Sequence, residues 1–517
     1  MKLNYKRTIL VGFAFFLISV FWQAYDSTIP LILTNKFGMS QTWSGVIMAL
    51  DNILAVFMLP LFGSLSDKCS TKYGKRTPFI AIGTTIAAVA LIGLSFVDNI
   101  QLKNIADVSA IDDPAALEVI YETQGNQQLL TPEGEEFVLS QTFTKEQFTA
   151  IRSKVVSPDT GKEVTNSDYT NYVAPARQAY AWQVTIQNFG TLILFIVLLL
   201  IILIAMATFR SPAVALMPDV TLKPLRSKGN AVINLMGTAG GILVLVMGMV
   251  FSTSALKNSL MSYTVFYCVV AGVMLAALVI FLVSVKEKSW AQQMYDDSVK
   301  YGIEEEEEDT AGKRGLTSGE KRSLICILLS IALWYFGYNA VTSKYSVYAA
   351  NILHKDYNTT LLIAQAAAIV AYLPAGMVAS KIGRKKTIIS GVVMLTAAFG
   401  FASMMRDESP TWLMNVLFAL AGIAWATINV NSFPMVVEMC SGADIGKYTG
   451  FYYTASMSAQ IVTPMLSGVL MDQFGMTTLF PYAAVFVALA FVTMLLVRHG
   501  DSKVAVKKGL EAFDLDD

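Results

Sequence analysis

Long apolar segments separated by short polar connections run through the whole chain. A helix needs about 20 apolar residues to cross a bilayer, and runs of that length predict twelve spans in two groups of six. The first group is 8–34, 43–64, 77–97, 187–209, 229–251 and 262–284; the second is 322–343, 360–379, 387–405, 411–432, 448–470 and 478–498. The expected fold class is an all-α membrane protein made of two six-helix bundles.

Polar segments set the domain boundaries. Residues 98–186 form a long acidic loop between the third and fourth spans, so the N-terminal bundle with this loop covers 1–285. Residues 286–321 contain a run of glutamates and predict a solvated linker, followed by the C-terminal bundle at 322–498 and a tail at 499–517. The loop is expected to be an extracytoplasmic insertion, which is either inert and partly ordered or a lid that touches substrate.

Composition and charge support a membrane location and exclude nucleic acid as a partner. Hydrophobic residues make up 54% of the chain and charged residues 15%, against about 25% charged in an average soluble domain. The 38 basic residues balance the 38 acidic ones, so the chain lacks the positive charge that binds a phosphate backbone. Most of the lysines and arginines fall on the side of the bilayer that holds both termini, which predicts cytoplasmic termini.

The two groups of spans resemble each other, as expected of duplicated halves. The second span of each group ends in a proline, a glycine and a cluster of charges, at 59–76 in the first half and at 373–385 in the second. Acid and base recur again after the fourth span of each half. These repeated charges are Asp67, Lys68, Arg76, Asp219, Arg226, Glu438 and Lys447.

Several of these segments resemble the major facilitator superfamily. Residues 63–68 (GSLSDK) with 74–76 (GKR) are similar to its signature between helices 2 and 3, lengthened by a few residues. Residues 77–80 (TPFI) and 210–219 (RSPAVALMPD) are similar to the glycoside-pentoside-hexuronide cation symporters, especially their sucrose- and maltose-transporter-like branch. The resemblance implies sugar uptake across a plasma membrane, and it implies that the repeated charges form the cytoplasmic gate of alternating access.

The coupling ion is expected to be a proton. Melibiose-type members of that family hold sodium with two aspartates in helix 2, and this chain has Ala55 and Leu59 there. A hard cation requires several oxygen ligands, so their loss favours protons. Asp26 and Asp51 each lie eight residues from the outer end of a span, and a carboxylate at that depth is a functional candidate. For Asp51, a hydrogen bond that packs helices is the alternative.

Sugar is expected to bind polar and aromatic residues that share helix faces, because residues three and four apart lie side by side. The resemblance places helices 1, 4, 7 and 10 around the cavity. The candidates for substrate binding there are Gln23, Tyr335, Tyr338, Asn339, Trp425 and Asn429. Asn339 occupies the position in the second half that Asp26 has in the first, so only one half would titrate.

Two function classes remain open from the sequence. The first is a proton-coupled symporter for a maltose- or sucrose-like disaccharide or oligosaccharide; the second is a carrier of amphipathic molecules such as lysolipids or drugs on the same fold. An enzyme is not expected, because the sequence lacks nucleophile–base pairs and phosphate-binding glycine loops. The spacing of its cysteines and histidines gives no metal site, so no metal or cofactor is predicted.

Overall fold

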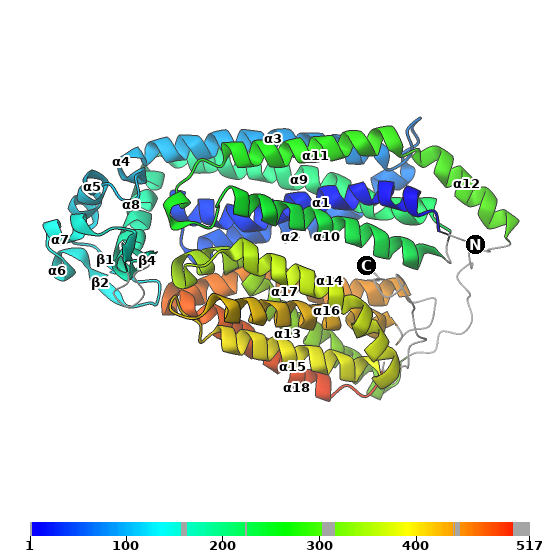
Figure 1. Ribbon diagram of the computed structural model, residues 1–517. Coiled ribbons are helices and arrows are strands. Elements are labelled where there is room, and N and C mark those ends of the chain that lie inside the picture. The colour runs from blue at the N-terminus through cyan, green and yellow to red at the C-terminus, as the bar shows by residue number, and fades with distance from the viewer. Residues whose placement is uncertain are drawn as a thin grey trace.

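The computed structural model describes residues 3–156, 163–222, 225–301, 316–437, 439 and 445–499. Two bundles of long helices lie side by side, and a small domain covers one end of the molecule (Figure 1). We name that end the loop end. The opposite end, where α1 begins and α18 ends, is the termini end.

The N-terminal bundle contains a helix at each of the first six predicted spans. Its helices are α1 (Tyr5–Leu31), α2 (Gln41–Lys68), α3 (Thr77–Asn104), α9 (Phe189–Val220), α10 (Arg226–Val250) and α11 (Thr264–Ser284). The π-helical turn η1 (Ile32–Lys36) extends α1, and the short 3-10 turn η4 (Leu256–Asn258) follows α10. Buried side chains of these helices pack into one hydrophobic core, as expected when each helix buries an apolar face.

The C-terminal bundle has its own hydrophobic core. Its elements are α13 (Ser318–Tyr348), η5 (Ala349–Leu353), α14 (Tyr357–Ile382), α15 (Arg384–Ala402), α16 (Thr411–Val437), α17 (Ile445–Phe474), η7 (Met476–Thr478) and α18 (Leu479–Leu495). In the described chain, ten helices are long and apolar enough to cross a membrane, and α14 and α17 are not among them. Both nevertheless lie at predicted spans and are 26 and 30 residues long.

The described part of the acidic loop is a folded domain with a hydrophobic core of its own. Its elements are α4 (Ala106–Ser109), α5 (Pro114–Gln124), β1 (Gln128–Leu130), β2 (Glu136–Val138), α6 (Leu139–Thr142), α7 (Lys145–Ala150), β3 (Lys154–Val156), β4 (Glu163–Thr165), η2 (Tyr169–Val173) and α8 (Ala174–Gln187). The strands form two antiparallel hairpins. Leu117, Phe148 and Tyr169 are fully buried in the core.

The predicted solvated linker is also partly helical. Helix α12 (Glu287–Lys300) follows α11, and α13 already begins at Ser318. The Trp290 ring is only 8% exposed because it joins the core of the N-terminal bundle, where the Arg7 guanidinium lies 5.3 Å from its centre. A single buried tryptophan gives no helical periodicity, so the sequence pattern did not reveal this contact.

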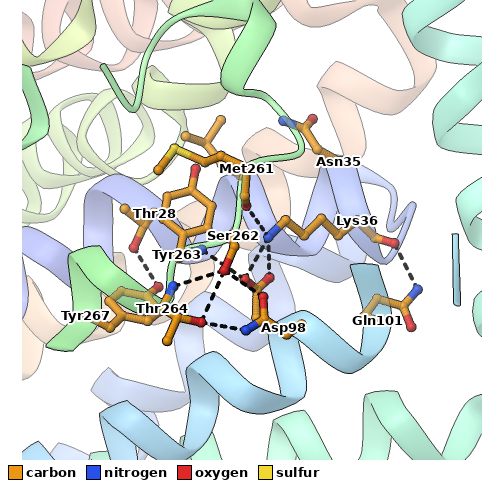
Figure 2. Close-up of polar contacts among 12 residues, drawn as sticks. Thr28, Asn35, Lys36, Asp98, Gln101, Met261, Ser262, Tyr263, Thr264 and Tyr267 are labelled. Atoms are coloured by element: carbon orange, nitrogen blue, oxygen red, sulfur yellow. Dashed lines mark hydrogen bonds and ion pairs between the residues drawn. The ribbon is translucent and has the colours of Figure 1, made fainter. Parts of the chain in front are cut away.

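A buried ion pair fixes the loop end of the N-terminal bundle (Figure 2). Lys36 Nζ lies 2.6 Å from Asp98 Oδ1, and both side chains are fully buried. Lys36 Nζ also donates to the carbonyl of Met261, and Gln101 donates to the carbonyl of Lys36. These bonds tie the end of α1 to α3 and to the connection before α11.

The two bundles meet at the loop end. Asp472, near the end of α17, accepts hydrogen bonds of 2.7 Å from the backbone nitrogens of Gln41 and Thr42 at the start of α2. Lys344 of α13 donates to the carbonyl of Gln41 at 2.6 Å. A Cβ on Gly45 would lie 2.0 Å from the carbonyl oxygen of Pro464, so α2 and α17 are in backbone contact.

A second cross-bundle contact joins the loop ends of α10 and α14. Ser254 donates to Asp356 at 2.7 Å, and the hydroxyls of Thr253 and Tyr357 are 2.7 Å apart. Burial raises the pKa of Asp356, but hydrogen bonds from Thr359, Ser254 and Asn358 outweigh it and hold the pKa below its ordinary value. Asp356 is therefore an ionised acceptor at neutral pH.

Candidate functional site

A cavity of about 460 Å³ lies between the two bundles. Its walls come from α1 and α10 on one side and from α13, α14 and α16 on the other. The polar and aromatic side chains on it include Trp22, Gln23, Asp26, Asn234, Tyr338, Gln365 and Trp425. The volume is within the range of about 300–1,000 Å³ typical of small-molecule sites.

Helix α1 supplies the polar wall through its spacing. Ser19, Gln23 and Ser27 follow one another at intervals of four, and Trp22 and Asp26 do the same beside them. Residues four apart share a helix face, so all five side chains face the cavity. The Gln23 amide donates to Ser27 at 3.0 Å. Asp26 places a carboxylate on this wall of the cavity.

An amide pair crosses the cavity from one bundle to the other. Gln365 Nε2 of α14 donates to Gln23 Oε1 of α1 at 2.6 Å. Beside this pair, Trp22 Nε1, Asn234 Nδ2 and Gln365 Oε1 are buried and have no hydrogen-bond partner within the described part of the chain. An unpaired buried polar atom costs about 1–3 kcal/mol, so a ligand hydroxyl that pairs with these atoms would be favoured.

Aromatic rings form the opposite wall. Tyr338 of α13 and Trp425 of α16 stack with ring centres 3.6 Å apart and planes 6° from parallel. Tyr335 meets the edge of Trp425 with centres 5.2 Å apart, but it does not line the cavity. Stacking on Tyr338 and support from Tyr335 fix the orientation of the tryptophan ring that the cavity presents.

The residues predicted to bind substrate or to couple protons therefore fall into two groups. Gln23, Asp26, Tyr338 and Trp425 line the cavity together. The predicted residues that do not line it are Asp51, Tyr335, Asn339 and Asn429. Asp51 accepts a hydrogen bond of 2.8 Å from the amide of Asn52, the next residue of α2, and this bond joins no second helix.

Several lining residues are not among the site residues predicted from the sequence. Asn234 and Gln365 look like single amides that join helices, and Ser19 and Ser27 look unremarkable in isolation. The spacing of four between the serines and Gln23 was an available signal. No signal along the chain could show that Gln365 reaches Gln23, because the two are 342 residues apart.

Three of the predicted gate residues come together at the termini end. Arg76 pairs with Asp67 at the end of α2 and, at 2.8 Å, with Asp219 at the end of α9. Partial burial lowers the pKa of Arg76, but the charges and hydrogen bonds of the two aspartates outweigh it and raise the pKa above its ordinary value. Arg76 is therefore the charged centre of this cluster.

Glu287 of α12 completes the cluster. Its carboxylate accepts backbone hydrogen bonds from Arg76 at 2.8 Å and from Thr77 at 2.7 Å, at the start of α3. A carboxylate there is favoured by the free N–H groups of a helix N-terminus. The sequence placed Glu287 in a solvated linker and gave no signal for this role.

The other predicted gate residues lie apart from Arg76 or outside the described structure. Lys68 is exposed, and Arg226 donates to the carbonyl of Thr221 at 3.3 Å. Glu438 and the side chain of Lys447 lie outside the described residues. Ion pairs among the predicted gate residues are thus described for the first half only.

Family models match both halves of the chain. A model described as MFS/sugar transport protein matches residues 10–102, and one described as Major Facilitator Superfamily matches residues 324–514. Among curated relatives, an MFS-type transporter of Metarhizium rileyi is 28% identical over 169 residues, which are 32% of this chain and 33% of that protein. A sucrose transport protein of Arabidopsis thaliana is 33% identical over 57 residues, or 11% of each chain.

The chain thus spans about a third or less of the length of these relatives in the matched regions. Solved structures cover far more of it. The xylose transporter XylE from E. coli, inward open, has a TM-score of 0.58 and 15% identity over 99% of both chains. A mutant of the nucleoside transporter NupG has a TM-score of 0.55 and 14% identity over 95% of this chain and 100% of that one.

These similarities show the major facilitator fold, so the two-bundle prediction is confirmed at that level. The relatives are transporters and not enzymes, which confirms the prediction that this chain is not an enzyme.

Proposed function

We propose that this chain, which has the major facilitator fold and matches two family models of that superfamily, is a proton-coupled symporter for a maltose- or sucrose-like disaccharide or oligosaccharide. The match of the first half to a sugar-transport model and the short similarity to sucrose transport proteins support a sugar substrate. All twelve long helices would cross the plasma membrane, with the loop end outside and both termini in the cytoplasm.

One observation carries the proposal: a carboxylate shares its cavity with amides and stacked aromatic rings. Asp26 faces the same space as Gln23, Gln365 and Trp425. Amides both donate and accept hydrogen bonds, which suits sugar hydroxyls, and the ring of a tryptophan covers the apolar face of a sugar. A buried carboxylate binds a proton more readily than one in water.

Coupling would follow from this arrangement. Protonation of Asp26 removes a charge from the cavity, and that charge is costly to enclose within the membrane. The loaded cavity could then close on one side and open on the other. The Gln23–Gln365 hydrogen bond and the loop-end contacts would break and re-form in each cycle, and the Arg76 cluster would act at the cytoplasmic gate.

The test compares wild type with Asp26→Asn in reconstituted vesicles that carry a proton gradient. We expect the substitution to lower uphill accumulation of radiolabelled maltose or sucrose at least tenfold, while exchange of internal for external sugar survives. Asp297→Asn on α12 is a matched control that should leave accumulation unchanged. Uphill accumulation that survives in Asp26→Asn would contradict proton coupling through this residue. No saturable exchange of either sugar by wild type would instead favour the carrier of amphipathic molecules.

A further inference from the structure

A second cavity of about 470 Å³ lies at the loop end and shares no lining residue with the central cavity. Three parts of the chain build it. The N-terminal bundle contributes Gln41 and Trp43, the insertion contributes Trp182 and the turn at 129–134, and the C-terminal bundle contributes residues near Met476.

The turn between β1 and β2 is held tightly against the C-terminal bundle. Met476 donates its backbone N–H to the carbonyl of Pro132 at 2.7 Å. Gly134 and Gly475 have φ angles of +94° and +87°, which favour glycine. A Cβ on Gly475 would lie 2.3 Å from the carbonyl oxygen of Glu133. At this point the cavity wall is formed by a close backbone contact between the insertion and the C-terminal bundle.

One buried polar side chain on the wall of this cavity is an uncharged amide. Gln41 is only 2% exposed, yet neither its amide nitrogen nor its amide oxygen has a hydrogen-bond partner among the described residues. The acidic Asp472 on the same wall is already satisfied, because it accepts two backbone N–H groups and the Thr42 hydroxyl. The free hydrogen-bonding capacity of Gln41 therefore suits a neutral ligand that both donates and accepts.

Two tryptophan rings also line this cavity. Trp43 is 57% exposed and lies on the cavity, and Trp182 lies on the same cavity from the insertion. Amphipathic rings beside a free amide favour a ligand with hydroxyl edges and an apolar face. We propose that this loop-end cavity is a second binding site for a neutral polyhydroxylated ligand, of the same sugar class as the central cavity. The choice of sugar rests on the proposed function.

The test is isothermal titration calorimetry of maltose and sucrose into the purified full-length protein in lipid nanodiscs. Wild type should bind two molecules per chain. Trp43→Ala and Gln41→Leu should each weaken one site at least tenfold, and Trp425→Ala should weaken only the other. Trp412→Ala is the matched control, because Trp412 is 64% exposed and lies outside both cavities.

The outcomes separate the two proposals. A single site that is lost in Trp425→Ala and unchanged in both Trp43→Ala and Gln41→Leu would overturn the second site and leave the proposed function intact. No binding of either sugar to folded wild type would overturn both. Gln41→Leu keeps the size of the side chain, so a loss of binding there without a change in thermal stability cannot be attributed to misfolding.

Discussion

The two ends of the N-terminal bundle hold ion pairs of opposite character. At the loop end, Lys36 and Asp98 are both fully buried. At the termini end, Arg76 is buried, but its partners Asp67 and Asp219 are 62% and 33% exposed. Removal of one member of a buried pair is strongly destabilising, because it leaves the other charge buried and unpaired. In an exposed pair, water can hydrate the charge that remains. The Lys36–Asp98 pair is therefore suited to holding one conformation, and the Arg76 pairs are suited to a region that changes conformation.

Contacts between the bundles differ in the same way. At the loop end, Asp472 and Lys344 join α17 and α13 to the start of α2. The contacts of Arg76 and Glu287 at the termini end join residues of the N-terminal bundle to one another. The structure is thus held together across the bundles at the loop end. In the proposed transport cycle, these contacts would break when the loop end opens.

The largest expected effect is on the buried pair. Lys36→Ala leaves Asp98 charged and unpaired, which should lower the free energy of unfolding by about 3–5 kcal/mol. Lys145→Ala in the insertion is the matched control, since Lys145 forms exposed pairs with Glu118 and Glu122, and its loss should change the free energy of unfolding far less than Lys36→Ala. Denaturant unfolding in detergent measures both. Equal losses would contradict the distinction drawn here.

A smaller effect is expected at the contact between bundles. Asp472→Ala removes the acceptor at the start of α2, and a lost cap of this kind costs about 1–2 kcal/mol. The closed loop end should therefore be disfavoured by roughly 5- to 30-fold. Spin labels at Ile186 of α8 and Trp412 of α16, both exposed, would report a longer distance. Asp296→Ala on the exposed face of α12 is the control, and an unchanged distance in Asp472→Ala would rule out this contact as a latch.

The smallest effect is expected at the termini end. Asp67→Asn should change the free energy of unfolding by less than about 1 kcal/mol, because Asp67 is mostly exposed and Arg76 keeps Asp219. Asp219→Asn should cost more, because that carboxylate is less exposed. Thermal unfolding of the two variants gives the order. A larger loss for Asp67→Asn would mean that exposure does not set the strength of these pairs.

The sequence predicted the helical framework well, because spans of about 20 apolar residues are a local pattern. It also singled out Arg76, Asp67 and Asp219 as charges repeated at matched positions in the two halves, but not that Arg76 pairs with both aspartates. The sequence pattern did not reveal the helices and strands of the insertion, because helices of four to six residues and strands of three are too short to show a hydrophobic period. Helix α12 was missed because its buried residues, Glu287 and Trp290, are too few to give an apolar period.

The candidate site was only partly predictable for a similar reason. Gln23 with Asp26, and Tyr338 with Trp425, were found from residue type and spacing, and they do meet at one cavity. Asn339 and Asn429 have the same residue types but do not line it. Rotation of a helix about its axis decides which face meets the cavity, and that rotation is set by packing against distant segments.

Proton-coupled sugar symport is tested most directly by uptake of radiolabelled maltose and sucrose by wild-type protein in energised vesicles, with and without a proton-dissipating ionophore. We expect saturable accumulation of one of these sugars that collapses when the ionophore is added. Accumulation that is unaffected by the ionophore, or no saturable uptake of either sugar by folded protein, would contradict it.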